Sequence, residues 1–367
     1  MFLALREIRA ASGRFLLMGS VVVLVAALVG IVSGFTTGLG NDTVSALRGL
    51  PADQMAFASD AKSDQFNRSL VDREALGDWR GRDGVEAAPL GVSITRGTTD
   101  RGTDVDVAAF GVEPGSFLAP RPEEGRALGS VHDGIVISRD LADEGVRTGD
   151  TLTVDRLGIE LPVTGVAGSA SYGHVPAAYL PLDTWQRVRF TTPGASQDKL
   201  PDEFSGIALR GEGAAGAPAK VAGTTALPME KVYEAAPGYS GERLTMTSIQ
   251  VFLYLIAPLV VGAFFAVWTV QRGPELALLR ALGAARRTLL WHAVLQAALV
   301  VAAGTLAGGV LASGVGLLVG SAVPFSLPLA TLLTTLAGVA AAGLAGTALT
   351  LRRVTAPDPL VMLGAAR

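Results

Sequence analysis

The sequence contains no cysteine, which excludes disulfides, thiol nucleophiles and thiolate metal sites. Its three histidines, His132, His174 and His292, do not have the spacing of a metal motif such as HExxH. Its four lysines follow Ala, Asp, Ala and Glu, so the Gly-Lys pair of a phosphate-binding P-loop is missing. The chain therefore lacks the motifs for thiol chemistry, for a metal centre and for an ATPase of its own.

Charge is scarce as well. Only 17% of the 367 residues are charged, against roughly 25% in soluble domains. The deficit is local, because four long runs are almost free of charge while the middle of the chain has the composition of a soluble domain. The net charge of −3 is too small to indicate a nucleic-acid partner. These features predict a membrane protein with a large polar insertion.

The four apolar runs are long enough to cross a bilayer. The first, Leu16 to Gly38, reaches about 34 Å as a helix, more than the ~30 Å of the hydrocarbon core. A cleaved signal peptide is the alternative for this run, although it exceeds the usual apolar region and no clear cleavage site follows. Gly30, Gly34 and Gly38 recur every four residues, a pattern that allows another helix to approach closely. Pro258 lies inside the second run, where neighbouring helices can satisfy the freed carbonyl.

The insertion between the first and second runs shows mixed α and β signals. Ser138 is positioned to cap a short helix over 139–144, and Asp183 to cap a second helix around Trp185. No nucleophile elbow or paired-carboxylate motif stands out, so we predict no catalytic residue and a protein that is not an enzyme. The expected strands are 55–58, 85–94, 105–112, 134–137, 151–155, 159–166 and 178–182.

Arginines in the short connections indicate the orientation, because such loops are enriched in Lys and Arg on the cytoplasmic side. With both termini inside, the arginines before the first span, between the second and third and after the fourth are all cytoplasmic, and the insertion lies outside. They are Arg6, Arg9, Arg14, Arg272, Arg280, Arg286, Arg287, Arg352 and Arg353. We predict a cytoplasmic amphipathic lead at 1–15, spans at 16–38, 248–270, 288–320 and 329–351, an extracytoplasmic domain at 39–247, a cytoplasmic helix at 271–287, an outer loop at 321–328 and a cytoplasmic tail at 352–367.

The spans hold no ionisable residue apart from His292 near one end of the third, which argues against a proton-driven transporter or an ion channel. Energy must then come from a partner on the cytoplasmic face. The stretch Gln271–Arg287 is the best contact, since Pro274 and Glu275 favour a helix start and leucines recur on one face. The alternative is an interfacial helix that lies on the lipid headgroups.

The motif Q-R-x-P-E-L-A-L-L-R-A-L-G-A from Gln271, in a chain of one span, a large outer domain and three spans, resembles the FtsX/MacB-type ABC transporter permeases. The segments 110–117, 135–142, 149–153 and 181–185 of the insertion look like the MacB-like core domain. The resemblance implies an integral membrane α-helical fold, with four transmembrane helices (1+3) and an α/β extracytoplasmic domain, in a bacterial plasma membrane. It also makes 271–287 the coupling helix against a separate ABC ATPase, with contacts from Arg272, Pro274, Glu275, Leu276, Leu279, Arg280 and Leu282.

The opening residues, from Met1 to Phe15, most resemble actinobacterial HrtB-type haem-efflux permeases. That resemblance implies a dimer of two permeases with two ATPase subunits, ATP and Mg²⁺ in the ATPases, and no permanently bound cofactor. It also implies haem as cargo, at a site in the dimer interface between first and second spans, near the outer leaflet. The alternatives within the superfamily are an FtsX-like transmitter that controls an extracellular partner, and an exporter of lipoproteins, peptides or drugs.

An axial haem ligand needs a lone pair from His, Met, Tyr or a carboxylate beside an apolar wall. Near the outer ends of the first two spans the first candidate is Glu242, because a carboxylate just above the bilayer is costly without a partner. Its alternative role is a solvated charge paired with Arg243. His174 is expected to be an ordinary surface histidine. The other haem candidates are Tyr239, Met246, Phe35 and Phe252.

Overall fold

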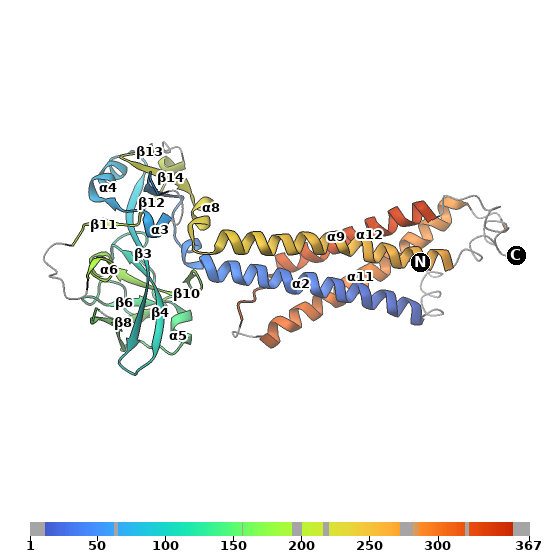
Figure 1. Ribbon diagram of the computed structural model, residues 1–367, viewed down its shortest axis with the longest axis horizontal. Helices are drawn as coiled ribbons and strands as arrows, with labels where there is room; N and C mark the ends of the chain where they lie inside the picture. The colour runs from blue at the N-terminus through green and yellow to red at the C-terminus, as the bar shows by residue number, and fades with distance from the viewer. Residues whose placement is uncertain are drawn as a thin grey trace. The chain divides into compact units, whose positions relative to one another are not determined.

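The computed structural model describes residues 12–61, 65–155, 157–192, 200–215, 220–271, 282, 285–319 and 323–354 (Figure 1). The chain forms two compact units. One contains Met1–Leu39 and Arg243–Arg367, and we call it the membrane unit. The other is Gly40–Glu242, which we call the outer domain.

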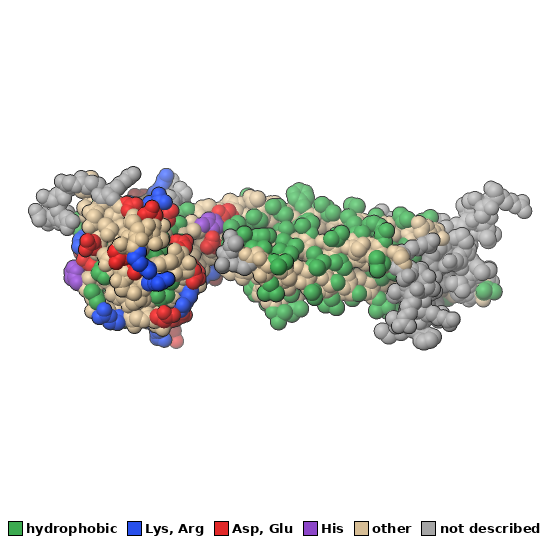
Figure 2. All heavy atoms as spheres, turned by 90° about the horizontal axis from the view of Figure 1, so that it is seen from below, with side chains coloured by type: hydrophobic (Ala, Val, Ile, Leu, Met, Phe, Trp, Pro, Cys, Tyr) green, Lys and Arg blue, Asp and Glu red, His purple; other side chains and the backbone are tan. Residues whose placement is uncertain are grey.

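Four long helices carry the predicted spans: α2 (Ser12–Arg48), α9 (Tyr239–Gln271), α11 (Arg286–Val319) and α12 (Leu329–Val354). All four are long and apolar enough to cross a membrane. On the described part of the membrane unit, Figure 2 shows many hydrophobic side chains at the surface, as expected where lipid replaces water. The four-helix prediction is confirmed, but α2 continues to Arg48, well past the predicted span end at Gly38.

The glycines of α2 face two different kinds of neighbour. A Cβ on Gly30 would lie 2.8 Å from the Cβ of Ala312 on α11, which is the close helix contact that the spacing predicts. At Gly34 and Gly38 the neighbour is instead the loop before α12: a Cβ would lie 2.2 Å from the Phe325 ring and 2.3 Å from the Pro324 carbonyl oxygen. The amide of Ser326 also donates to the carbonyl of Gly34 (3.0 Å). Part of the small-residue face therefore receives a loop, and not a helix.

Pro258 lies inside α9, and its carbonyl group is packed against α12. A Cβ on Gly346 would lie only 2.2 Å from the carbonyl oxygen of Pro258. Glycine at this position thus allows the backbones of α9 and α12 to meet beside the proline.

A large mixed sheet forms the outer domain. Its strands follow the order β13-β14-β1-β12-β3-β4-β10-β6-β8-β5, and β7 pairs with both β3 and β8. Six strands therefore pair in a closed ring, in the order β3, β4, β10, β6, β8 and β7. Each of them has a paired strand on both sides, so the ring has no free edge. The bounds of the sheet strands are β1 Gln54–Ala58, β3 Glu86–Thr99, β4 Asp104–Val112, β5 Glu124–Gly125, β6 Ile135–Ile137, β7 Thr151–Val154, β8 Ile159–Val166, β9 Ser171–Tyr172, β10 Val175–Pro181, β12 Gly206–Arg210, β13 Lys220–Val221 and β14 Thr224–Pro228; β2 (Val71–Asp72) pairs separately with β11 (Glu203–Phe204).

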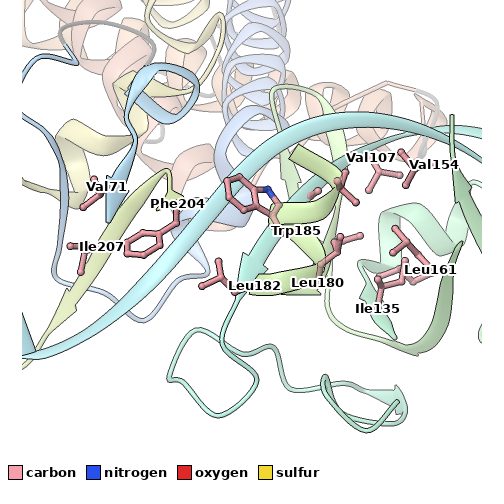
Figure 3. Packing of buried hydrophobic residues seen from close by; sticks show 14 of the residues in the cluster. Val71, Val107, Ile135, Val154, Leu161, Leu180, Leu182, Trp185, Phe204 and Ile207 are labelled. Carbon is pink, nitrogen blue, oxygen red and sulfur yellow. The ribbon is translucent and has the colours of Figure 1, made fainter. Parts of the chain in front are cut away.

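Alternate residues of the strands enter two cores. On β4, Val105, Val107 and Ala109 belong to one cluster, while Ala108 and Phe110 belong to the other. The first cluster surrounds Trp185, with Phe204 and Ile207 on one side and Leu180 and Ile135 on the other (Figure 3). The side chains of each strand alternate between the two faces of the sheet, and both faces are covered. This period of two residues explains why many of these strands could be predicted from the sequence.

Short helices cover the sheet, and their caps test two predictions. Ser138 accepts a hydrogen bond from the amide of Leu141 (3.3 Å) at the start of α5, so this cap is confirmed. The cap at Asp183 is wrong: α6 begins at Leu182 after Pro181, and Asp183 is an acidic residue of the first turn. The α/β fold is confirmed. The short helices are α3 Gln65–Arg68, α4 Arg73–Arg80, α5 Arg139–Asp143, α6 Leu182–Phe190, α7 Glu212–Ala215, α8 Met229–Val232 and the 3₁₀ helix η1 Tyr233–Ala235.

Candidate functional site

Glu242, the first predicted cargo residue, lies in the first turn of α9 and belongs to the outer domain. Its carboxylate faces the tip of the β9–β10 hairpin and residues near the end of α2. The hairpin turn consists of Gly173 and His174, which have φ angles of 60° and 64°. Two consecutive positive φ values are typical of a type I′ turn, and histidine is one of the few non-glycine residues enriched there.

The imidazole of His174 lies between two carboxylates. Its Nδ1 is 2.7 Å from Oδ2 of Asp42, and its Nε2 is 2.9 Å from Oε1 of Glu242. The hydroxyl of Thr43 donates to the other oxygen of Glu242 (3.1 Å), and the carbonyl of Thr43 accepts the amide of Gly173 (2.9 Å). One cluster of side chains, here called the His174 cluster (Asp42, Thr43, His174 and Glu242), therefore joins three elements of the outer domain.

Partial burial of His174 acts to lower its pKa, since it disfavours the charged ring. Hydrogen bonds and charges from Glu242 and Asp42 act in the opposite direction and prevail, so the pKa of His174 is raised above 6.5. The side chain remains about one-third exposed, at 35%, which leaves the ring accessible to protons from solvent.

The structure corrects the expectation for His174, which is not an ordinary surface histidine. It also gives Glu242 a different ion-pair partner from the predicted Arg243: within the part of the chain that the structure describes, the partner is His174. Asp42 was missed altogether. The sequence holds one usable signal, the Gly-His pair between two apolar segments, but nothing in it shows that residues 42, 174 and 242 meet.

Tyr239 and Glu242 are close in sequence but differ in their surroundings. Tyr239 is buried in the second core of the outer domain, beside residues of the β sheet. Its side chain is therefore part of the packing, and it is a poor candidate for a cargo ligand.

In the membrane unit the predicted cargo residues are Phe35, Met246 and Phe252. Phe252 is highly exposed, whereas Met246 is half-buried. The ring of Phe35 packs edge-to-face on Phe325, with centroids 5.3 Å apart. Phe252 thus offers a free apolar surface, and Phe35 shares an aromatic pair with the loop before α12.

A small polar cluster links three helices of the membrane unit. The amide nitrogen of Gln250 lies 3.3 Å from the hydroxyl of Ser33 and 3.4 Å from that of Thr36. The hydroxyl of Thr335 donates to Ser33 (3.2 Å). Hydrogen bonds of this kind hold membrane helices in register, so the cluster has a sufficient role in packing α2, α9 and α12.

A cavity of about 450 Å³ opens on the outer domain, and its charged lining is already paired. Arg80 bonds Glu113 (2.7 Å), and Arg210 bonds Glu86 while its guanidinium lies over the ring of Phe117. Among the described residues, no group of three His, Asp or Glu side chains is placed to hold a metal ion.

The predicted coupling residues Arg272, Pro274, Glu275, Leu276, Leu279 and Arg280 lie outside the described residues. Leu282 is described, and it is 77% exposed in a turn before α11. The assignment of this stretch to ATPase coupling stays a prediction.

The C-terminal part of the chain matches a known family, and the whole chain is similar to known proteins. Residues 247–359 match the FtsX-like permease C-terminal family. The whole chain is similar to the putative hemin transport system permease protein HrtB of Staphylococcus haemolyticus, with 22% identity over 364 residues and 99% of each chain covered. The corresponding protein of Staphylococcus epidermidis is 21% identical over 370 residues, again with 99% of each chain covered.

Two solved structures are similar to part of the chain. The extracellular domain of the ABC-type transporter YknZ from Gram-positive bacteria is 17% identical, with 44% of this chain and 83% of that chain covered and a TM-score of 0.32. The periplasmic region of MacB from Actinobacillus actinomycetemcomitans is 13% identical, with 51% and 93% covered and a TM-score of 0.35. These matches show an FtsX-like permease C-terminal domain at residues 247–359 of a chain that has four candidate spans and is similar over its full length to permeases.

Proposed function

We propose that this permease is the membrane subunit of an efflux transporter that exports haem, or a similar amphipathic molecule, from the membrane. The observation that carries the proposal is the similarity to putative hemin transport permeases over 99% of both chains. It is also supported by Glu242, a partly exposed carboxylate in the first turn of α9. A carboxylate is one of the groups that can supply an axial ligand to haem iron.

ATP hydrolysis belongs, in this proposal, to a separate ABC ATPase, with two ATPase subunits serving two copies of the permease. Both termini and the stretch 271–287 lie in the cytoplasm, and the outer domain lies outside the cell. The arginines of the short connections support this orientation. ATP binding by the partner would move 271–287 and thereby shift the second and third spans.

The test of the cargo is a haemin titration of the full chain purified with its ATPase. We expect a shift of the Soret band and a stimulation of ATP hydrolysis, and both should weaken at least tenfold in apparent affinity when Glu242→Ala removes the carboxylate. Glu234→Ala is the matched control, since Glu234 is an exposed carboxylate of the same region that forms a salt bridge with Lys231 (3.9 Å). Unchanged spectra in the parent chain would exclude haem, and equal loss in both variants would exclude a specific role for Glu242.

The test of the coupling stretch uses Glu275→Lys and Leu279→Asp. Glu275→Lys reverses a charge on the proposed contact with the ATPase, and Leu279→Asp adds a charge to it. We therefore expect transport to fall at least tenfold while ATP hydrolysis persists. Cargo efflux and ATP hydrolysis are measured together in proteoliposomes. Transport that survives both changes would indicate an interfacial helix that lies on the lipid headgroups.

An FtsX-like transmitter is the alternative from another functional class. Such a protein would move its outer domain to control an extracellular partner and would carry no cargo. In that case haemin would change neither the spectrum nor the ATPase rate, and an extracellular enzyme would depend on this permease for its activity.

A further inference from the structure

The segment 323–328, which precedes α12, is seated on α2 by its backbone. A Cβ on Gly38 would lie 2.7 Å from the Cα of Phe325. The amide of Ser326 donates to the carbonyl of Gly34 (3.0 Å). Backbone meets backbone at this contact, so the rotation of a side chain cannot loosen it.

The ring of Phe325 extends the contact from α2 to α11. A Cβ on Gly34 of α2 would overlap the ring, and a Cβ on Gly316 of α11 would lie 2.5 Å from it. The ring also packs edge-to-face on Phe35 of α2, with centroids 5.3 Å apart. An aromatic ring that meets glycines of two helices fills the space through which those helices would slide past each other.

The backbone of 323–328 is suited to a place among apolar helices. The segment has no charged residue, and its two prolines carry no N–H that would need an acceptor. Gly34, which accepts the amide of Ser326, lies inside the apolar run 16–38. Non-helical backbone at membrane depth is tolerated where protein buries it and satisfies its polar groups. Withdrawal from α2 would leave the Ser326 amide without this acceptor, so the seated form is favoured.

The helices around the segment also pack directly on one another. A Cβ on Gly308 of α11 would lie 2.6 Å from the Cβ of Ala26 on α2. A Cβ on Gly309 would lie 2.7 Å from the side chain of Leu336 on α12. The segment 323–328 therefore adds a further connection to three helices that are already in close contact.

We propose that the segment 323–328 is a strap, which fastens α2 to α11 and α12 so that the three helices move as one body. α2 continues past the strap to Arg48. A displacement of α11 and α12 is therefore carried by α2 beyond the apolar run. The strap depends on packing and on one backbone hydrogen bond, so it is independent of the assignment of haem as cargo.

The first test measures the connection between α2 and α11 with pairs of spin labels on the full chain in lipid nanodiscs. Because the chain has no cysteine, Leu28→Cys with Leu317→Cys places labels only at these two exposed sites. We expect a narrow distribution of distances that becomes at least about twice as wide in Phe325→Ala and in Ser326→Pro, since the packing that restricts α2 is lost. Phe325→Ala removes the ring, and Ser326→Pro removes the N–H that Gly34 accepts.

Two controls separate the strap from a general loss of packing. Ser326→Ala keeps the backbone N–H, so the distribution should stay as narrow as in the parent chain. A second label pair, Leu311→Cys with Leu333→Cys, lies on α11 and α12. Its distribution should stay narrow in Phe325→Ala, since these two helices also pack on each other directly. An unchanged α2–α11 distribution in both Phe325→Ala and Ser326→Pro, or an equal broadening of both label pairs, would overturn the proposal.

The second test asks whether the helices stay together while ATP is hydrolysed. Gly34→Cys with Phe325→Cys replaces the ring by two thiols that mild oxidation should join, because both lie in the space of the ring. In the full chain purified with its ATPase, without cargo, we expect the oxidised and reduced forms to hydrolyse ATP at rates within about threefold of each other, because a bond between parts that do not separate hinders no motion.

Two results of this test would overturn the proposal. A pair that does not form a disulfide would contradict the contact itself. A larger loss of ATP hydrolysis on oxidation, restored by a reductant, would mean that α2 must part from the strap during the cycle. A failure of haemin to bind would exclude the proposed cargo and would leave both results unaffected.

Discussion

Trp185→Ala is expected to lower the free energy of unfolding of the outer domain by about 3–5 kcal/mol, the usual cost of removing a large buried aromatic side chain. The Trp185 side chain is fully buried, and its Nε1 donates to the hydroxyl of Ser93 (3.0 Å). The side chain also lies directly over two glycines: a Cβ would lie 2.3 Å from the ring at Gly91 and 2.5 Å from the ring at Gly111. The variant therefore leaves both a cavity and an unpaired hydroxyl in the middle of the core.

The absence of cysteine makes this prediction measurable in the full chain. A cysteine introduced at Ala178, a fully buried position of the same core, reacts with a thiol reagent only when the domain opens. With Trp185→Ala we expect the labelling rate to rise by more than about a hundredfold, since each 1.4 kcal/mol corresponds to about a factor of ten. Trp291→Ala is the matched control, because Trp291 is largely exposed on α11. A rate within about threefold of the parent for Trp185→Ala would contradict the packing described here.

The contact between Trp185 and Gly91 adds a second measurement of the same core. Gly91→Ala should be strongly destabilising in the parent, because the added methyl group would overlap the indole. In the Trp185→Ala background the methyl group would enter the cavity, so the cost should largely disappear. If the losses of unfolding free energy from Gly91→Ala and Trp185→Ala simply add in the double variant, Gly91 and Trp185 do not touch.

Gly38→Ala should destabilise the membrane unit by about 3 kcal/mol, at the upper end of the range for overpacking. The new Cβ would lie 2.3 Å from the Pro324 carbonyl oxygen and 2.7 Å from the Phe325 Cα, and these backbone atoms cannot rotate away. The measurement is the thermal unfolding of the full chain in detergent, followed by circular dichroism.

Two variants of the same region make the comparison specific. Gly19→Ala, on the same helix, has open space around its Cβ position and should be neutral or slightly stabilising. The three atoms nearest to a Cβ at Gly34 all belong to the ring of Phe325, so the cost of Gly34→Ala should fall when Phe325→Ala is added. Equal unfolding temperatures for Gly38→Ala and Gly19→Ala would contradict the tight seating of this loop on α2.

Local features of the fold were predictable where one element determined them. The spans follow from the length and apolarity of each run, and Ser138 caps α5 because its partner Leu141 is three residues away. β4 was predicted because Val105 and Phe110 bury opposite faces. The cap at Asp183 failed because Pro181 is the residue that precedes the helix, so α6 begins at Leu182, two residues earlier than a cap at Asp183 would give.

The candidate site was predictable only in part, for a physical reason. The composition and the lengths of the apolar runs were sufficient to predict a membrane protein, and the motif that begins at Gln271 indicated the permease superfamily. Glu242 could be selected because a carboxylate at the mouth of a span needs a partner. The identity of that partner, His174, depended on the fold of the outer domain, which brings residues from 42, 174 and 242 together. Likewise, the spacing of Gly34 and Gly38 predicted a close neighbour, but only tertiary packing decided that it was a loop, since a glycine face accepts any backbone that fits.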